Sequence, residues 1–204
     1  MSAQPLPYYT HQQYVEMEEN ASYKSEFIAG RIYAMSGGTP KHSAIGANIT
    51  GEMRSLLRQG PCQVYTSDLR VGIMPLDVET YPDVTIVCGE PRLNPFDKNS
   101  LINPSVIFEV LSPSTERYDR GEKWARYQRL DSLQQYVLVS QDTPRVEHFT
   151  RRDDGTWNYA AVEGLDAASG LTVLGAALSL AEIYDRVTFE EGVGERPTSE
   201  PEIV

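Results

Sequence analysis

The spacing of apolar residues along the chain predicts several short strands and few helices. Apolar runs bounded by turn-forming residues predict strands over 63–66, 69–74, 84–87, 106–111 and 136–140. Runs of this length fit the strands of a sheet better than helices, which normally need ten or more residues.

Two further pairs of strand-like runs are separated by turn residues and predict hairpins. The hairpin over 27–35 turns at Ala29-Gly30, and the hairpin over 145–162 turns around Asp153-Asp154-Gly155. The segment 89–103 is rich in proline, asparagine and charged residues and therefore predicts a loop.

Helix signals occur in three places. Thr10 followed by Gln13 has the form of a capping box, which predicts a short helix from that point. Thr39 as N-cap with Pro40 in the first position predicts a longer helix ended by Gly60-Pro61. Its apolar residues fall on one face and are Ile45, Ile49, Met53 and Leu56. A third helix is predicted over 120–130. Because hairpins, strands and helices do not alternate strictly, the pattern favours an α+β fold with a mixed sheet.

With 204 residues, the chain is long enough for one domain with a substantial core. We expect an N-terminal extension over 1–9, one folded domain over 10–189, and an acidic, disordered tail over 190–204. No apolar run approaches the length of a membrane span, and the N-terminus lacks the basic and apolar regions of a secretory signal. We therefore expect no membrane association.

The two cysteines, Cys62 and Cys88, belong to no CxxC pair and have no histidine at metal-ligand spacing. A zinc site is therefore not indicated, and at most one disulfide bond could form. This cysteine content fits a reducing, cytoplasmic setting.

The net charge of −11, from 18 basic and 29 acidic residues, excludes a protein that coats nucleic acid broadly, because such proteins are basic. The net charge does not exclude a nuclease. Basic residues after the 106–111 strand offer either a local basic surface or an ordinary solvated helix face. These residues are Arg117, Arg120, Lys123, Arg126 and Arg129.

The most informative residue is Glu109, which lies inside an apolar run that otherwise predicts a buried strand. Burying an ionised carboxylate without a partner is costly, so such a group is paired, protonated or bound to a metal. Asp83 opens another apolar run, and Lys123 follows Glu109 at a short distance. Two carboxylates on neighbouring strands with a lysine nearby suit a divalent cation and a phosphate. We expect the Asp83 and Glu109 carboxylates to converge on one point of the sheet.

Each of these residues also has an ordinary structural interpretation. Asp83, which follows a proline, could be a turn residue at the start of a strand. Glu109 could form a buried structural ion pair with an arginine. Lys123 could pair with Asp119 on the surface of a helix.

Motifs in four places carry a family resemblance. They are Tyr81-Pro82-Asp83-Val84, then Phe108-Glu109-Val110-Leu111-Ser112-Pro113-Ser114-Thr115, then Asp119-Arg120-Gly121-Glu122-Lys123 with Tyr127, and finally Gln135-Tyr136-Val137-Leu138-Val139. Together they closely resemble the Uma-two family, which belongs to the PD-(D/E)xK superfamily of restriction-endonuclease-like proteins. The resemblance extends from Thr10 to Asp185.

This resemblance implies a restriction-endonuclease-like mixed sheet flanked by helices and a Mg²⁺-dependent cut of phosphodiester bonds. Matched to the family pattern, Asp83 and Glu109 are the expected metal ligands, and with Lys123 they are the expected catalytic residues. The superfamily usually places its lysine two residues after the glutamate, where this chain has Leu111. The resemblance implies that Lys123 takes that part, reaching in from the next helix.

Two further positions match the family pattern as auxiliary residues. Glu26 could add a carboxylate to the metal site, or it could be a solvent-facing strand residue. His42, in the first turn of the helix that begins at Pro40, could contact phosphate or the bound water. A surface or packing role is its alternative.

The sequence thus predicts an endonuclease that hydrolyses DNA with a Mg²⁺-activated water, Mn²⁺ being an alternative cofactor. A two-fold homodimer is the simplest way for such a chain to cut both strands of a duplex. The competing interpretation is a nucleic-acid-binding or regulatory module that retains the nuclease fold without cutting, which Leu111 and the acidic charge favour. A structural protein with buried ion pairs is the third.

Overall fold

The structure, a computed structural model, describes residues 7–167 and 171–189. The predicted tail over 190–204 and most of the predicted extension over 1–9 therefore lie outside the described residues. Among the helices of the described part, none is both long and apolar enough to cross a membrane.

A six-stranded mixed sheet, here called the central sheet, has the strand order β12-β11-β10-β9-β6-β3. Its strands are β3 (Cys62–Thr66), β6 (Val84–Cys88), β9 (Val106–Leu111), β10 (Gln135–Ser140), β11 (Arg145–Arg151) and β12 (Trp157–Glu163). Strands β9 and β10 are parallel, and the other pairs are antiparallel. The predicted strands over 63–66, 84–87, 106–111 and 136–140 and the hairpin over 145–162 are confirmed within one or two residues.

A second six-stranded sheet has the order β2-β1-β5-β4-β8-β7. Its strands are β1 (Ser25–Ile28), β2 (Arg31–Ala34), β4 (Arg70–Ile73), β5 (Val78–Thr80), β7 (Leu93–Asn94) and β8 (Asp97–Leu101), with the short 3₁₀ helix η1 (Met74–Leu76) between β4 and β5. A small hairpin of β13 (Leu171–Val173) and β14 (Ala176–Leu178) completes the strands of the described residues. The sequence predicted one mixed sheet, and the structure divides the strands between two.

The helical segments are α1 (His11–Asn20), α2 (Pro40–Leu56), α3 (Glu116–Tyr118), the π-helical turn η2 (Asp119–Lys123), α4 (Trp124–Tyr127) and α5 (Leu180–Ile183). Both predicted N-termini are confirmed: Thr10 forms a capping box with Gln13, and the Thr39 side chain accepts a hydrogen bond from the backbone N–H of His42. Of the predicted apolar face of α2, Ile45, Ile49 and Met53 are buried, but Leu56 at the helix end is exposed.

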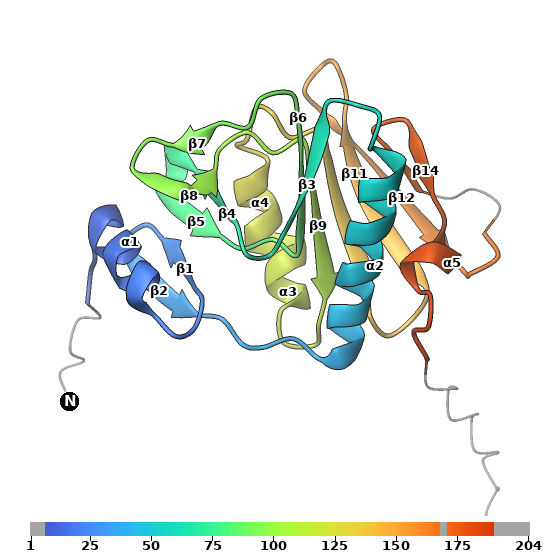
Figure 1. The fold of residues 1–204 in the computed structure, drawn as a ribbon, viewed down its shortest axis with the longest axis horizontal. Helices are drawn as coiled ribbons and strands as arrows, with labels where there is room; N and C mark the ends of the chain where they lie inside the picture. The colour runs from blue at the N-terminus through green and yellow to red at the C-terminus, as the bar shows by residue number, and fades with distance from the viewer. Residues whose placement is uncertain (1–6, 168–170, 190–204) are drawn as a thin grey trace, which may run out of the picture.

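The central sheet is covered on both faces by different elements (Figure 1). Val106, Phe108 and Val110 of β9 point into a core shared with α2 and α5, whereas Ile107 and Leu111 point into a second core. Residues of α4 and of strands β4 and β5 in the second sheet line that second core. Because side chains alternate along a strand, Glu109 faces the side of α3, η2 and α4.

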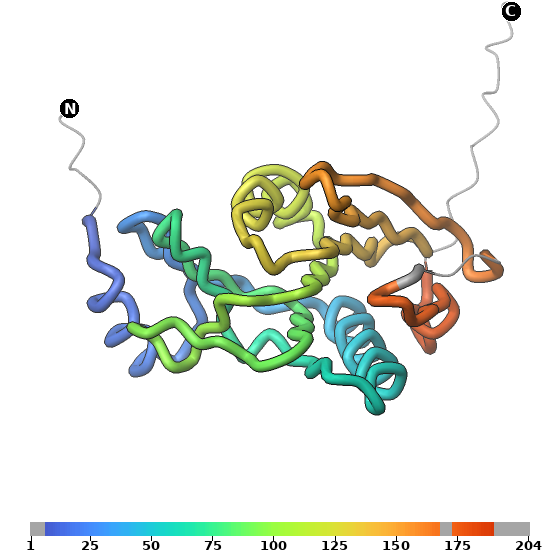
Figure 2. The backbone as a smooth tube through the Cα atoms, turned by 90° about the horizontal axis from the view of Figure 1, so that it is seen from above, coloured from blue at the N-terminus to red at the C-terminus, as the bar shows by residue number. Residues whose placement is uncertain are grey.

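Seen from above, the N-terminal α1 and the C-terminal α5 lie at opposite ends of the molecule (Figure 2). The second sheet lies toward the α1 end, and the central sheet toward the α5 end (Figure 1). The segments that follow β9 pass between the two sheets, which is where the candidate residues meet.

Two predictions of secondary structure were wrong. The predicted loop over 89–103 contains β7 and β8, in which Asn94, Asp97 and Ser100 are buried in ion pairs and hydrogen bonds. Arg70 and Asp97, for example, form a buried bidentate pair with N···O distances of 2.7 and 2.9 Å. The helix predicted over 120–130 begins earlier, at Glu116, and its middle is the π-helical turn η2.

Cys62 and Cys88 face each other across β3 and β6 and form a disulfide bond. The sequence allowed one such bond but favoured a reducing setting. Because disulfides are rare in reducing compartments, the bond weighs against that expectation. A cytoplasmic location stays a prediction.

Candidate active site

The centre of the site is a buried ion pair between Glu109 and Lys123. Lys123 Nζ lies 2.9 Å from Glu109 Oε1, and the two residues are only 5% and 3% exposed. Glu109 comes from the middle of β9, and Lys123 comes from η2, which folds back over the end of that strand. The expected approach of Lys123 to Glu109 is therefore present. The pair of Lys123 with Asp119 also forms, but it is buried and does not lie on a helix surface.

Two more carboxylates surround the same ammonium. Lys123 Nζ lies 3.4 Å from Glu26 Oε1 and 3.6 Å from Asp119 Oδ1. Burial alone would lower the pKa of Lys123, but the carboxylates of Glu109, Glu26 and Asp119 outweigh it and hold that pKa well above its usual value. The surrounding carboxylates therefore favour the protonated form of Lys123.

Burial has the opposite effect on the pKa of the neighbouring carboxyl groups. Burial raises the pKa of Glu109 well above its usual range, and the Lys123 ammonium only partly offsets this effect. Burial also raises the pKa of Asp119. A single ammonium does not balance the charge of Glu26, Glu109 and Asp119, so an additional cation would stabilise the ionised carboxylates.

Tyrosine hydroxyls complete the contacts of the cluster. Tyr127 donates a hydrogen bond to Glu109 Oε1 at 2.9 Å, and its oxygen lies 3.0 Å from Thr80 Oγ1. Tyr118 donates to Glu26 Oε2 at 3.0 Å and accepts from Arg126 at 3.1 Å. These contacts fix the orientation of both glutamates.

Asp83 enters the site from the start of β6. Val84 pairs with Phe108 in the antiparallel ladder of β6 and β9, which brings the preceding Asp83 alongside Glu109. Asp83 Oδ2 accepts a hydrogen bond from the backbone N–H of Val110 at 2.7 Å.

His42 also faces Asp83. His42 Nε2 lies 3.3 Å from Asp83 Oδ2, and this contact raises the pKa of His42. The Thr39 cap fixes the first turn of α2, and Gly38 packs so close to the ring that an added Cβ would lie 2.9 Å from Nδ1. His42 therefore does not take the surface role considered above. It is held in a fixed position beside Asp83, a predicted metal ligand.

One groove joins all of the predicted site residues. Asp83, Glu109, Lys123, Glu26 and His42 all line a cavity of about 1480 Å³. Typical small-molecule pockets measure about 300–1,000 Å³. The size of this groove therefore suits a polymer better than a small metabolite.

Sequence reasoning named Asp119 as a partner of Lys123 and quoted Tyr127 in the family motif, but it placed neither residue in the candidate site. Both lie at four-residue intervals from Lys123, so the sequence spacing already placed the three residues on one helix face. What the spacing does not reveal is the π-helical turn over Asp119–Lys123, a feature that is frequent at functional sites.

Of the five basic residues after β9, Arg117 and Arg129 are exposed, whereas the other three are not free to form a local basic surface. Lys123 is buried, and the Arg120 guanidinium is engaged by Glu147 at 2.7 and 2.9 Å and by Glu116 at 2.7 Å. Arg126 pairs with Glu122 at 2.8 Å. These cations are committed to intramolecular partners.

The candidate site offers mainly carboxylate oxygens, the donor type that Mg²⁺ prefers. Among the described residues, no group of three or more histidine, cysteine, aspartate or glutamate side chains is arranged to hold a metal by itself. Mg²⁺ usually binds through one or two carboxylates and keeps water and substrate oxygens as its other ligands. The oxygen donors of Asp83 and Glu109, next to an excess of negative charge, fit this requirement.

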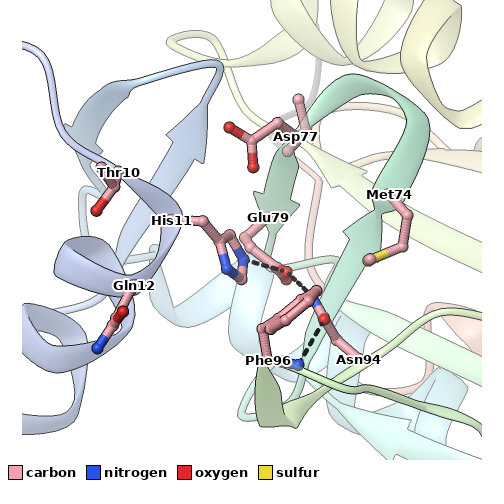
Figure 3. A pocket seen from close by; sticks show the side chains of 9 residues that line it. Thr10, His11, Gln12, Met74, Asp77, Glu79, Asn94 and Phe96 are labelled. Carbon is pink, nitrogen blue, oxygen red and sulfur yellow. Dashed lines mark hydrogen bonds and ion pairs between the residues drawn. The ribbon is translucent and has the colours of Figure 1, made fainter.

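A second, smaller cavity of about 340 Å³ lies between α1 and the second sheet (Figure 3). Its central contact joins His11 Nε2 to Glu79 Oε1 at 3.0 Å, and Asn94 donates to the same oxygen at 2.8 Å. Phe96 and Met74 line its rim. None of the predicted site residues lines this cavity.

The fold and the site define a protein of the restriction-endonuclease-like class. The Uma2 family, described as "Putative restriction endonuclease", matches residues 11–181. The chain belongs to this family, which confirms the resemblance found in the sequence.

Two relatives from Synechocystis sp. are "Uncharacterized protein slr1290", 35% identical over 91% of this chain and 96% of its own length, and "Uncharacterized protein sll1609", 32% identical over 78% and 89%. A crystal structure described as a putative nuclease belonging to DUF820 from Anabaena variabilis superposes with a TM-score of 0.71. It covers 90% of this chain and 100% of the other at 20% identity, so it supports the fold.

Proposed function

We propose that this chain is a metal-dependent endonuclease that hydrolyses phosphodiester bonds in DNA. The observation that carries the proposal is the placement of Lys123 Nζ 2.9 Å from Glu109 Oε1 in the groove that Asp83 also lines. In this proposal Lys123 takes the part of the lysine that the superfamily motif would place at position 111. Membership of the Uma2 family supports the same reaction class.

Asp83 and Glu109 would hold a Mg²⁺ or Mn²⁺ ion. When bound, such an ion polarises a phosphoryl group and lowers the pKa of a water molecule. Lys123, kept protonated by its carboxylate neighbours, can donate hydrogen bonds to a phosphate oxygen and stabilise the negative charge that grows on it. Glu26 and His42 would position other residues of the site. Glu26 forms an ion pair with Lys123 and accepts a hydrogen bond from Tyr118, and His42 contacts the Asp83 carboxylate.

The test is a cleavage screen of the full chain with Mg²⁺ or Mn²⁺ against supercoiled plasmid, linear duplex, single-stranded DNA and RNA. We expect cleavage of at least one form of DNA. The Glu109→Gln variant should cleave about 10²–10³-fold more slowly, since removing one preorganised charged group from a site typically costs that much. Glu79→Gln is the matched control, because Glu79 is a buried glutamate on a strand that does not line the groove. It should cleave like the parent chain.

Calorimetric titration of Mg²⁺ and Mn²⁺ separates the proposal from its alternatives. Metal binding without cleavage of any substrate would favour the non-cutting, nucleic-acid-binding module. Equal activity of Glu109→Gln and the parent chain would reject the proposed site. Homodimerisation stays a prediction, which light scattering at micromolar concentration can check.

A further inference from the structure

Two tyrosines on the wall of the groove are exposed, unlike the tyrosines around the carboxylates. Tyr23 is 64% exposed and Tyr33 is 47% exposed, and both line the groove. Within the part of the chain that the structure describes, neither hydroxyl makes a hydrogen bond and neither ring stacks on another. Tyr118 and Tyr81, which line the same groove, are instead hydrogen-bonded to Glu26 and Glu18. The groove therefore contains two aromatic side chains that make no hydrogen bond and no ring contact within the described part of the chain.

The position of Tyr33 relates one of these rings to the candidate site. Tyr33 on β2 lies directly opposite Glu26 on β1 in the antiparallel register. Side chains opposite each other on neighbouring strands project from the same face of the sheet. Because the Glu26 carboxylate reaches Lys123 at 3.4 Å, the Tyr33 ring lies one side chain away from the proposed catalytic centre.

The charge of the groove limits how it can attract nucleic acid. Its lining includes the acidic residues Glu26, Asp83, Glu109, Asp119 and Glu122 and the basic residues Lys24, His42, Lys123 and Arg126. Lys123 and Arg126 are already paired with groove carboxylates, and the whole chain carries a net charge of −11. Contacts to the phosphate backbone normally dominate affinity and come from free lysine and arginine side chains. This groove offers few of them, so affinity has to come from other contacts.

We propose that the groove binds nucleic acid with unpaired bases and that Tyr23 and Tyr33 stack on bases next to the phosphate that is cut. The inference rests on the proposed function and narrows its substrate to single-stranded or locally unpaired DNA. Bases in a duplex stack on one another and present only their edges, whereas unpaired bases offer their faces to aromatic side chains. Stacking on an exposed ring does not depend on net charge, which matches the acidic character of the groove.

The experiment measures binding separately from cleavage. Fluorescence anisotropy with Ca²⁺ follows a labelled thymidine oligonucleotide and a duplex of the same length, with gels to show that both stay intact. We expect the single strand to bind more tightly than the duplex. Tyr33→Leu and Tyr23→Leu should each weaken single-strand binding about tenfold, within the usual range for losing one stacked base.

Two further variants separate stacking from other effects. Tyr33→Phe keeps the ring and should keep the affinity. Phe96→Leu removes a ring that is 73% exposed but lines the small cavity, so it should change nothing. Tyr23 precedes β1, so its variant gives a second test if Tyr33→Leu disturbs strand β2. Unchanged binding by both leucine variants, or tighter binding of the duplex, would overturn the inference.

A cleavage arm distinguishes this inference from the function it rests on. A duplex with a central bubble of unpaired thymidines, incubated with Mg²⁺, should be cut inside the bubble. Cleavage of the paired arms at the same rate would overturn the substrate class but leave the endonuclease in place. Failure to cut any DNA, combined with tyrosine-dependent binding of single strands, would overturn the endonuclease and retain the stacking sites.

Discussion

Glu109 and Glu79 are both buried glutamates on strands, and each is joined to a basic side chain from another element, Lys123 for one and His11 for the other. Their other neighbours differ. Burial raises the pKa of Glu109 most, and the negative charges of Asp119 and Asp83 raise it further; its remaining hydrogen bond comes from Tyr127. Its surroundings contain too many like charges and too few donors.

Glu79 has only favourable partners. Its Oε1 accepts hydrogen bonds from Asn94 at 2.8 Å and faces His11 Nε2 at 3.0 Å, and its Oε2 accepts from Ser100 at 2.5 Å. Gly72 makes room for the carboxylate, because a Cβ there would lie 2.7 Å from Ser100 Oγ and 2.9 Å from Glu79 Oε1.

The difference teaches how a structural carboxylate can be told from a functional one. Burial is the same for both, so burial does not decide. A carboxylate surrounded by donors is already stabilised and has no need of a ligand. A carboxylate among other carboxylates, on the wall of an open groove, gains stability when a cation or a donor arrives.

The largest effect is expected at Lys123, whose removal should affect both activity and stability. Lys123→Met keeps most of the volume but leaves the carboxylates of Glu26, Glu109 and Asp119 without their common cation. We expect cleavage to fall at least about 100-fold. We expect the free energy of unfolding to fall by about 3 kcal/mol, because one partner of a buried ion pair is lost. Cleavage assays and urea denaturation measure the two effects.

The control for this change is Lys98→Met, since Lys98 is exposed on β8 and lines neither cavity. It should alter neither quantity. If the Lys123→Met variant folds and cleaves normally, Lys123 is not a catalytic residue, and His42 becomes the next candidate.

A smaller and purely structural effect is expected at Glu79. In Glu79→Gln, one carboxylate oxygen becomes an amide N–H₂ group, which donates and cannot accept a hydrogen bond. It then faces a donor of Asn94, Ser100 or His11, so a buried polar group is left unpaired. We expect a loss of about 1–3 kcal/mol in the free energy of unfolding, measured with urea. Cleavage below the denaturation temperature should stay within about twofold of the parent chain, since such a loss leaves the folded state dominant. A large fall in cleavage with unchanged stability would mean that the small cavity takes part in the reaction.

The sequence predicted the middle of the central sheet well because β6, β9 and β10 are buried on both faces, and a continuous apolar run such as Val106–Leu111 leaves little alternative. In the second sheet it predicted the hairpin of β1 and β2 and the strand β4, but it missed β5, β7 and β8. Strands β7 and β8 hold Asn94, Asp97 and Ser100 in buried hydrogen bonds, so their sequences resemble an exposed loop. Only contacts from Glu79 and Arg70, distant in sequence, make these polar residues suitable for a sheet.

The buried glutamates also differ in how well the sequence predicts them. Glu109 could be singled out because a carboxylate in an apolar run needs a partner, and the family pattern supplied Lys123 as that partner. The buried glutamate of the small cavity gave no such signal, because Glu79 stands between Val78 and Thr80 in an unpredicted strand. Its hydrogen-bond partners come from α1, β7 and β8, and no local pattern in the sequence connects them.

The smallest effect concerns the pH dependence of the His11–Glu79 contact. The hydrogen bond to Glu79 raises the pKa of His11, burial opposes this, and the charges of Glu79 and Asp77 near β5 and of Asp97 on β8 add to the rise. The folded state therefore binds the His11 proton more tightly than the unfolded state does. This contribution is fully present below the unfolded pKa, about 6.5, and is lost as the pH rises through the folded pKa.

His11→Gln tests this contact, because glutamine can still donate a hydrogen bond to Glu79 but does not titrate. We expect its stability deficit to be about 0.5–1 kcal/mol larger at pH 5.5 than at pH 9. His148 on β11 provides a control of opposite sign, since burial lowers its pKa and its ionisation destabilises the fold at acid pH. His148→Gln should therefore gain stability relative to the parent chain as the pH falls. If the His11→Gln deficit is the same at both pH values, the histidine is neutral in the fold, and Glu79 is held by hydrogen bonds without an ion pair. The contrast with Glu109 would then be sharper, because only Glu109 would depend on a buried cation.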